Sequence, residues 1–95
     1  MVHPKYHEGF DWDEENEEHL ASHGIYAYEV EQAYWNGVQW AKDHGDQSGD
    51  YFMFGRTDGG RRITVVIEFI EATRRLRAIT GWDSTTGERT KYFNE

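Results

Sequence analysis

Residues 51–80 read YFMFGRTDGGRRITVVIEFIEATRRLRAIT, and this stretch decides the fold. Runs at 51–56, 62–71 and 74–80 are rich in aromatic, β-branched or other apolar residues, which is typical of strands. The glycines of Asp58-Gly59-Gly60 reach positive φ at little steric cost, so they predict a tight hairpin between the first two runs. The sequence therefore predicts an antiparallel meander.

The middle run shows which face of that sheet is buried. Its apolar residues recur at every second position from Ile63 to Phe69 and share one face, because successive side chains of a strand point to opposite sides. The residues between them share the other face: Arg62, Thr64, Val66 and Glu68. We therefore expect one face in the core and the other at least partly solvated.

Two helices are predicted before the strands. The first spans 13–23, where Asp13 is a suitable N-cap and the following glutamates favour the positive end of the helix dipole. Gly24 supplies the left-handed residue that commonly follows a helix. The second spans 27–36, with apolar residues at helical spacing and Gly37 at its end.

The remaining elements are shorter. Residues 38–42 alternate weakly and predict a short strand, and the Gly, Asp and Ser content of 43–50 predicts a loop. Thr85 and Glu88 have the spacing of a capping box, so a short helix is expected to begin there and to end near Phe93.

The predicted fold class is α+β, with two N-terminal helices, an antiparallel meander of three to four strands and a short C-terminal helix. A chain of 95 residues suits a single domain with one modest core. We assign residues 10–95 to that domain and residues 1–9 to a flexible arm with little to bury.

Charge is divided unevenly along the chain. Residues 1–50 hold twelve acidic residues and two lysines, whereas residues 51–95 hold six acidic and eight basic residues. The net charge of −8 disfavours a polyanionic ligand, but every arginine except Arg89 falls on or next to a predicted strand. A local arginine cluster is what binding a phosphate backbone needs, so a small RNA-acting domain is compatible with this sequence.

The composition also excludes some classes of site. The chain has no cysteine, which excludes disulfides, thiol catalysis and cysteine-ligated metals. Its first residues lack the apolar run of a signal peptide, and its longest apolar stretch is far shorter than a membrane span. We therefore expect a cytoplasmic protein with no membrane association.

Short motifs in a fixed order carry a family resemblance. They are Trp12-Asp13, Asn16-Glu17-Glu18-His19, His23-Gly24-Ile25, Glu29-Val30-Glu31, Gly55-Arg56-Thr57, Gly60-Arg61, Val65-Val66, Arg77-Ala78-Ile79-Thr80, Glu88-Arg89 and Tyr92. Over roughly residues 10–93 this order resembles the BrnT family of bacterial toxins. The resemblance implies a RelE-like fold, the toxin role in a type II toxin-antitoxin system, metal-independent RNA cleavage that leaves 2′,3′-cyclic phosphate ends, and no cofactor.

The sequence departs from the family pattern in its last strand. Where an arginine usually follows, this chain continues from Ile79-Thr80 into Gly81-Trp82, and a lysine common in the first helix is absent. Loss of one such donor typically lowers a rate by ~10²–10³. Two alternatives therefore stay open: a catalytically weakened BrnT-like domain that binds a protein, and an unrelated domain whose acidic helices contact a basic partner.

The resemblance places phosphate contacts on the strands. Arg56, Arg62 and Arg77 match basic positions of the family pattern. We therefore choose Arg56 and Arg77 as catalytic candidates and Arg62 as an RNA-binding candidate. Trp82 is a further candidate RNA-binding residue, because an exposed indole can stack on a base. The structural alternative is that these arginines only solubilise a wet sheet face.

Three residues are candidates for proton transfer. His19 and His23 are the candidate acid and base, because the unperturbed pKa of imidazole, about 6.5, lies near neutral pH. Tyr92 can donate a proton as a phenol. A surface position facing Glu15 for His19, contact with the last helix carbonyls for His23 and a packing role for Tyr92 stay open.

His19 and His23 also have the spacing at which two imidazoles on a helix share a zinc ion, with a third ligand from Glu15, His3 or His7. The resemblance implies no metal, and we expect none. The partners it implies are RNA and a cognate antitoxin. A homodimer and a heterotetramer with the antitoxin both stay open.

Overall fold

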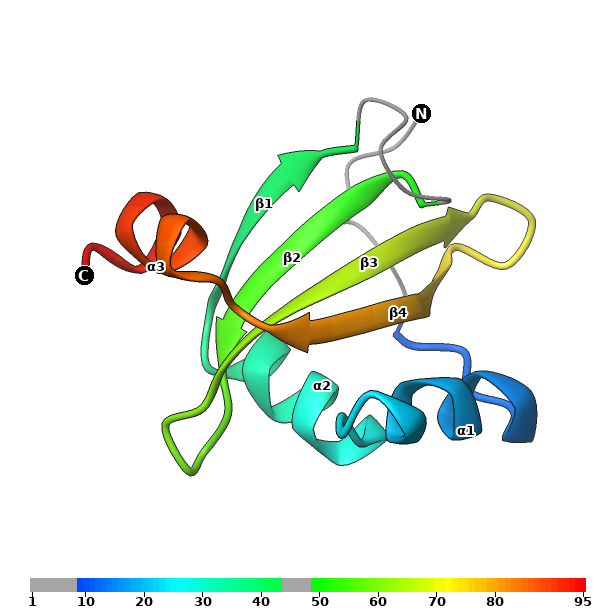
Figure 1. Cartoon of the computed structure of the whole chain (residues 1–95). Helices are drawn as coiled ribbons and strands as arrows, with labels where there is room; N and C mark the ends of the chain where they lie inside the picture. Colours follow the sequence, from blue (N-terminus) through cyan, green and yellow to red (C-terminus); the bar gives the residue numbers. More distant parts are fainter. Residues whose placement is uncertain (1–8, 44–48) are drawn as a thin grey trace.

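The computed structural model describes residues 9–43 and 49–95 of the chain, and they form three helices and one sheet (Figure 1). The elements in chain order are α1 (Glu14–Ser22), α2 (Ala27–Trp35), β1 (Val38–Lys42), β2 (Tyr51–Arg56), β3 (Arg62–Ile70), β4 (Arg75–Asp83) and α3 (Thr86–Phe93). Neighbouring strands pair antiparallel in the order β1-β2-β3-β4. The predicted α+β class and order of elements are confirmed.

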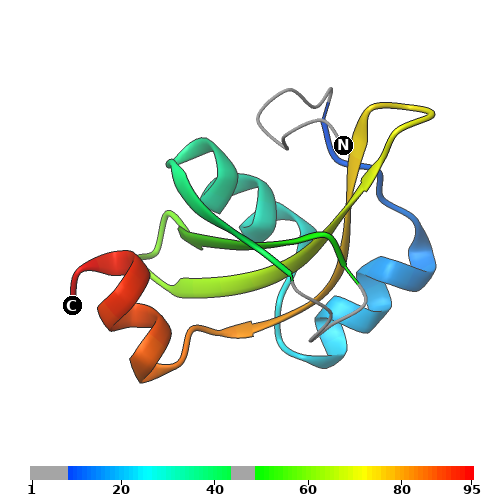
Figure 2. The ribbon, with the colours of Figure 1, turned by 90° about the horizontal axis from the view of Figure 1, so that it is seen from above.

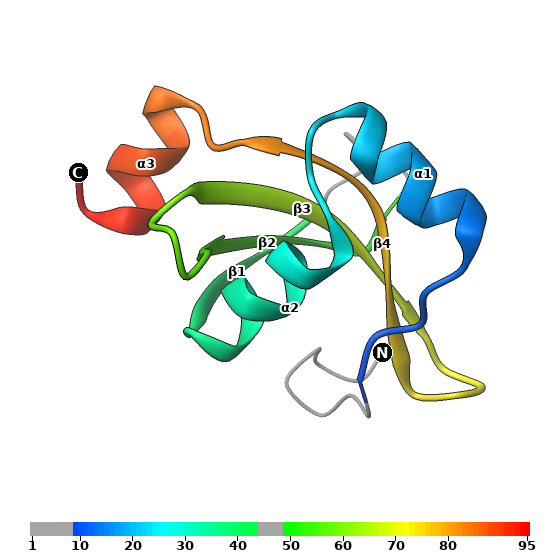
Figure 3. The ribbon, with the colours of Figure 1, turned by 90° about the horizontal axis from the view of Figure 1, so that it is seen from below.

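Helices α1 and α2 cover one face of the sheet (Figure 3). Helix α1 packs on β4, and α2 packs on β1, β2 and β3. Leu20, Val30 and Ala33 from the helices are fully buried against strand residues such as Met53 and Val65. The core therefore lies between the helix pair and this face of the sheet, while α3 stands at one end of the molecule and α1 at the other (Figure 2).

Strand β3 has the predicted alternation of core and non-core residues. Two residues in the middle of its non-core face are also buried, which was not predicted. Its core-face residues are buried: Ile63, Val65, Ile67 and Phe69. On the opposite face Arg62 and Glu68 are partly exposed, as expected, but Thr64 and Val66 between them have no exposed surface. Val66 packs beneath the backbone of Gly49, where a Cβ atom would lie 2.5 Å from its Cγ1.

Helix α1 begins as the sequence predicts. The Asp13 carboxylate accepts from the amide of Asn16 at 2.8 Å, and the Asn16 side chain accepts from the amide of Asp13 at 2.9 Å. The side-chain amide of Asn16 also donates to the carbonyl of Ala78 at 2.9 Å. One buried asparagine thus caps the helix and ties it to β4.

Strand β4 runs further than predicted, ending at Asp83 and not at residue 80. Gly81 lies inside it, where a Cβ atom would be 3.0 Å from the carbonyl oxygen of Thr64 and 3.1 Å from Cδ1 of Ile25. The glycine therefore allows close packing and does not end the strand. As a result Trp82 is a strand residue, paired with Thr64 of β3.

Helix α3 has the predicted capping box at Thr85 and Glu88. One oxygen of the Glu88 carboxylate accepts from the amide of Thr85 at 2.8 Å, the hydroxyl of Thr64 at 3.0 Å and the indole N–H of Trp82 at 3.1 Å. This carboxylate connects the first turn of α3 to both β3 and β4. It fixes α3 against the sheet face that α1 and α2 leave open.

Parts of the predicted N-terminal arm and of the predicted loop at 43–50 cannot be compared with the structure. Apart from Gly9, the predicted arm lies outside the described residues, as do residues 44–48 of the predicted loop. None of the helices in the described ranges is long and apolar enough to cross a membrane.

Candidate functional site

A row of four aromatic rings crosses the sheet face opposite α1 and α2. Trp82 meets Phe52 with ring centroids 6.4 Å apart, and Phe52 meets Phe54 at 6.3 Å. Phe54 is stacked on Tyr92 of α3 at 3.8 Å, with the planes 8° apart. Phe54 is buried, whereas the other three rings keep some exposed surface. The row therefore presents partly open aromatic surface on β4, β2 and α3.

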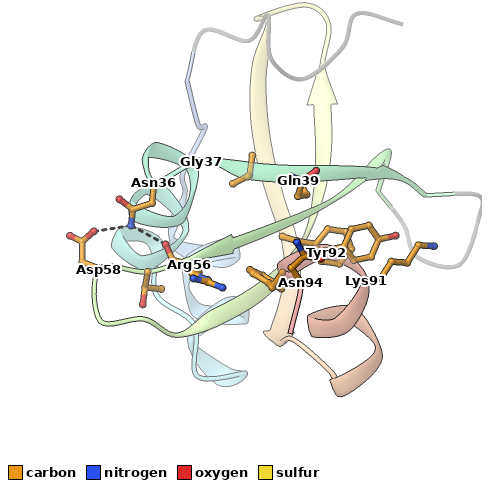
Figure 4. A pocket seen from close by; sticks show the side chains of 12 residues that line it. Asn36, Gly37, Gln39, Arg56, Asp58, Lys91, Tyr92 and Asn94 are labelled. Atoms are coloured by element: carbon orange, nitrogen blue, oxygen red, sulfur yellow. Dashed lines mark hydrogen bonds between the residues drawn. The ribbon is translucent and has the colours of Figure 1, made fainter.

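A cavity of about 1010 Å³ lies at the Tyr92 end of this row (Figure 4). Its walls come from the end of α2, the start of β1, the end of β2 and the last turn of α3. Arg56 and Lys91 are its two cations, Tyr92 supplies a phenol, and Asp58 supplies the one carboxylate among the residues that line it. In Figure 4, Asp58 and Tyr92 lie on opposite sides, with Arg56 between them.

Helix α2 holds one wall of this cavity in place. The side-chain amide of Asn36 donates to the carbonyl of Arg56 and to the carboxylate of Asp58, both at 2.9 Å (Figure 4). The Gln32 side chain accepts from the amide of Asp58 at 3.2 Å. These bonds anchor the β2–β3 turn to the end of α2. The main chain of Arg56 is therefore held in place at the edge of the cavity.

Aromatic rings also position the two cations. The guanidinium carbon of Arg56 lies 5.7 Å from the ring centre of Phe93, and the ammonium nitrogen of Lys91 lies 5.4 Å from that of Tyr92. Contacts at this distance attract a cation to the ring face. Both charges therefore stay near the aromatic surface.

A second group of cations adjoins the cavity. Arg56, Arg62 and Arg89 all approach the side-chain carboxylate of Glu95, with Arg62 hydrogen-bonded to it, Arg89 at 3.2 Å and Arg56 at 3.8 Å. Burial alone would raise the pKa of Glu95, but hydrogen bonds from Arg62 and Arg89 outweigh this effect and lower it. We call these four residues the Glu95 cluster.

Arg77 does not join this cluster. It pairs with Glu68 of β3, whereas Arg62 lies six residues earlier in the same strand, a separation of roughly 20 Å at the rise of a strand. The guanidinium of Arg77 instead donates to the Asp13 carboxylate at 2.5 Å, and this bond raises the pKa of Arg77. The same bond and the Asn16 amide lower the pKa of Asp13.

The two candidate histidines lie near Arg77. The rings of His19 and His23 are 5.0 Å apart on α1, and His19 and Arg77 line one small cavity of about 250 Å³ together with Asn16. Neither histidine lines the cavity that holds Arg56 and Tyr92. Because α1 and α3 stand at opposite ends of the molecule, the predicted site residues form two separate groups (Figure 2).

Four predicted residues therefore lie together on the open face and three do not. Arg56, Arg62, Tyr92 and Trp82 belong to the aromatic row, its cavity or the Glu95 cluster; His19, His23 and Arg77 lie at the junction of α1 and β4. Sequence reasoning missed Phe52 and Phe54, although their positions on either side of Met53 put both rings on the face opposite the core.

Within the described residues, no group of three or more His, Asp or Glu side chains could hold a metal ion. Glu15 therefore does not complete a site with His19 and His23, and the two other third-ligand candidates, His3 and His7, lie outside the described ranges. Comparisons of the chain with protein-family models, with curated proteins and with solved structures find no match.

Proposed function

We propose that the chain is the toxin component of a type II toxin-antitoxin system and that it cleaves single-stranded RNA, without a metal ion, on the open face of the sheet. The observation that carries the proposal is the aromatic row, which ends in a cavity containing Arg56 and Lys91. Rings that stack on bases beside cations that contact the backbone are the usual features of single-strand binding.

In the proposed complex the aromatic row binds the bases of the RNA and the cations of the cavity bind its phosphates. The partly exposed rings of Trp82, Phe52 and Tyr92 can each meet a base, and such stacking contributes about 1–3 kcal/mol per base. Arg56 and Lys91 face the phosphates, which gives affinity that falls with salt. A strand without a complementary partner fits this surface, because its bases are free to stack on protein rings.

The cavity also contains groups for cleavage. The 2′-oxygen attacks phosphorus, so a bond between the 2′-oxygen and phosphorus forms while the bond between phosphorus and the 5′-oxygen breaks. The products are a 2′,3′-cyclic phosphate and a 5′-hydroxyl. Arg56 stabilises the charge on the pentavalent phosphate, and Tyr92 gives a proton to the departing 5′-oxygen. Asp58 is the available acceptor for the 2′-hydroxyl proton.

Trp82 contributes aromatic surface and no charge. Its ring is one end of the row, and its N–H is held by Glu88 at 3.1 Å. At the place where the family pattern has a basic residue, this chain therefore offers stacking without charge. The positive charge of the site accordingly comes from Arg56 and Lys91 at the other end of the row.

Under this proposal the protein acts in the cytoplasm, and a cognate antitoxin keeps it inactive by covering the basic end of the sheet. The antitoxin would then compete with RNA for Arg56 and Tyr92. Its binding surface and the RNA site overlap, which accounts for inhibition without a change in fold.

A second candidate function, a protein-binding module, is favoured by a different surface. Trp35 is 80% exposed, and the stacked rings of Tyr26 and Tyr28 are 50% and 61% exposed. A hollow of about 700 Å³ beside the two tyrosines is lined by Trp12 and by glutamates of both helices. An aromatic surface with an acidic rim suits a basic partner, and it lies on α1 and α2, away from the aromatic row.

The experiment that tests the first function is incubation of the full chain with a labelled, unstructured RNA in the presence of EDTA. Cleavage with 2′,3′-cyclic phosphate ends is expected, and the Arg56→Ala protein should lose it. Trp35→Ala is the matched control, because it changes the surface of α2 and leaves the row intact. Intact RNA at high protein concentration would contradict cleavage and would favour the protein-binding function.

A further inference from the structure

The Glu95 cluster holds more positive charge than its one carboxylate neutralises. Arg56, Arg62 and Arg89 bring three guanidinium groups to the two oxygens of the Glu95 side chain. The guanidinium is charged at every accessible pH, so the cluster keeps a net positive charge of about two. A cluster of this kind favours an anion with more charge or more oxygens than a carboxylate has.

Arg62 shows that the cluster has unused hydrogen-bonding capacity. One of its terminal nitrogens donates to Glu95 and the other to the carbonyl of Gly60 at 3.2 Å. Its Nε atom is buried and has no acceptor. A buried donor without an acceptor costs free energy, so an additional oxygen at this place would be stabilising.

The position of the cluster connects it to the cavity beside the aromatic row. Arg56 belongs to both, because it lines the cavity and lies 3.8 Å from Glu95. Arg56 and Arg62 are also direct partners across β2 and β3, and Arg89 reaches them from α3. The three guanidinium groups are therefore held by three separate elements around one point.

We propose that Arg56, Arg62 and Arg89 form a phosphate-binding subsite and that the Glu95 carboxylate occupies it until a phosphate group displaces it. Inorganic phosphate carries more charge and more acceptor oxygens than a carboxylate, and arginine can bind it bidentately. A phosphate of an RNA backbone equals a carboxylate in charge, but a strand brings several of them to the protein at once. Assigning the phosphate to RNA rests on the proposed function, whereas binding of free phosphate does not. Glu95 acts as an internal competitor that lowers the affinity of the subsite.

The strength of this competition is limited by exposure. Arg56 and Arg89 have side chains 49% and 47% exposed, so solvent screens their attraction to Glu95. We therefore expect removal of the Glu95 charge to tighten phosphate binding by roughly 3- to 10-fold. Inorganic phosphate, or several successive phosphates of a strand, should still be able to displace the carboxylate.

The first experiment measures binding of a short fluorescein-labelled oligouridine to the full chain by anisotropy at low salt. Glu95→Gln should bind it roughly 3- to 10-fold more tightly than the unmodified chain. The matched control is Glu71→Gln, which makes the same charge change at an exposed position of the β3–β4 turn. Equal tightening by the two variants would overturn the proposal, because it would show an effect of net charge alone.

The second experiment separates the subsite from the proposed function. Inorganic phosphate is titrated into the unmodified chain and into Glu95→Gln, and the Arg62 Nε–H signal is followed by NMR. A shift that saturates at lower phosphate in Glu95→Gln supports the subsite even when the oligouridine does not bind, a result that would count against RNA as the ligand. No shift in either protein would overturn the subsite itself.

Discussion

The ring of Tyr92 lies flat on the ring of Phe54, with centroids 3.8 Å and planes 8° apart. This stack joins α3 to β2 and closes one end of the aromatic row. It also places the phenol of Tyr92 in the cavity that contains Arg56. Packing and, in the proposed mechanism, proton donation therefore meet in one side chain, and substitutions can separate the two roles.

Tyr92→Phe should keep the stack and lose the proton donor. We expect its free energy of unfolding to stay within about 0.5 kcal/mol of the unmodified chain and its rate of RNA cleavage to fall by ~10²–10⁴. Tyr92→Ala should in addition lower the free energy of unfolding by about 1–2 kcal/mol, because it removes an aromatic pair. Urea unfolding and single-turnover cleavage measure the two effects. An unchanged cleavage rate in Tyr92→Phe would remove the phenol from the mechanism.

Arg56→Ala should weaken RNA binding and make it less sensitive to salt. Each phosphate contact on a single strand contributes about 0.7 to the slope of log affinity against log salt, so the slope should fall by about that amount. Lys42→Ala is the control, since Lys42 is an exposed cation near the end of β1 that lies outside the cavity lining. Equal slopes for the two variants would show that Arg56 makes no phosphate contact.

Trp82→Arg tests whether the arginine that the BrnT resemblance leads one to expect at this position would raise cleavage. The substitution returns a cation to the end of the aromatic row, and we expect the cleavage rate to rise by up to about 10². Trp82→Phe, which keeps an aromatic ring without adding charge, should not raise it. If Trp82→Arg leaves the rate unchanged while RNA still binds, the absence of a cation at position 82 does not limit cleavage.

The ion pair of Asp13 and Arg77 should make stability depend on pH. The hydrogen bond from Arg77, with a smaller contribution from the Asn16 amide, lowers the pKa of Asp13 below its ordinary value of 3.8. A carboxylate with a lowered pKa stabilises the fold above its unfolded pKa, and this contribution is lost as pH falls through the folded pKa. Thermal unfolding should therefore show a smaller loss of stability below about pH 4 in Asp13→Asn than in the unmodified chain.

Most of the fold could be predicted from local signals. The capping residues Asp13 and Thr85 and the alternation in β3 are each set by neighbours a few positions away, so the sequence displays them directly. The length of β4 could not be read in this way. Gly81 looks like a strand end until the close approach of Ile25, a residue distant in the sequence, shows why no side chain fits there.

The site was harder to predict than the fold. Arg56, Arg62 and Arg77 all lie on neighbouring strands, but the sequence does not say at which end of the sheet each residue falls. The pairing register settles it by setting Arg56 opposite Arg62 and Arg77 opposite Glu68. His19 lies in α1 and His23 is its C-cap, and α1 packs on β4, at the opposite end of the molecule from α3 (Figure 2).

Helix α3 has no fully buried residue, and its attachments to the sheet include the Glu88 carboxylate, the Tyr92 stack, the Phe93 ring beside Arg56 and the pairs of Arg56 and Arg62 with Glu95. A segment held by so few contacts opens locally at a much lower free energy than the core strands. Amide hydrogens of α3 should accordingly exchange with deuterium well before those of β3. Each such opening would withdraw Tyr92 and Glu95 together, so the ring of Phe54 and the strand residues Arg56 and Arg62 would be uncovered in a single event.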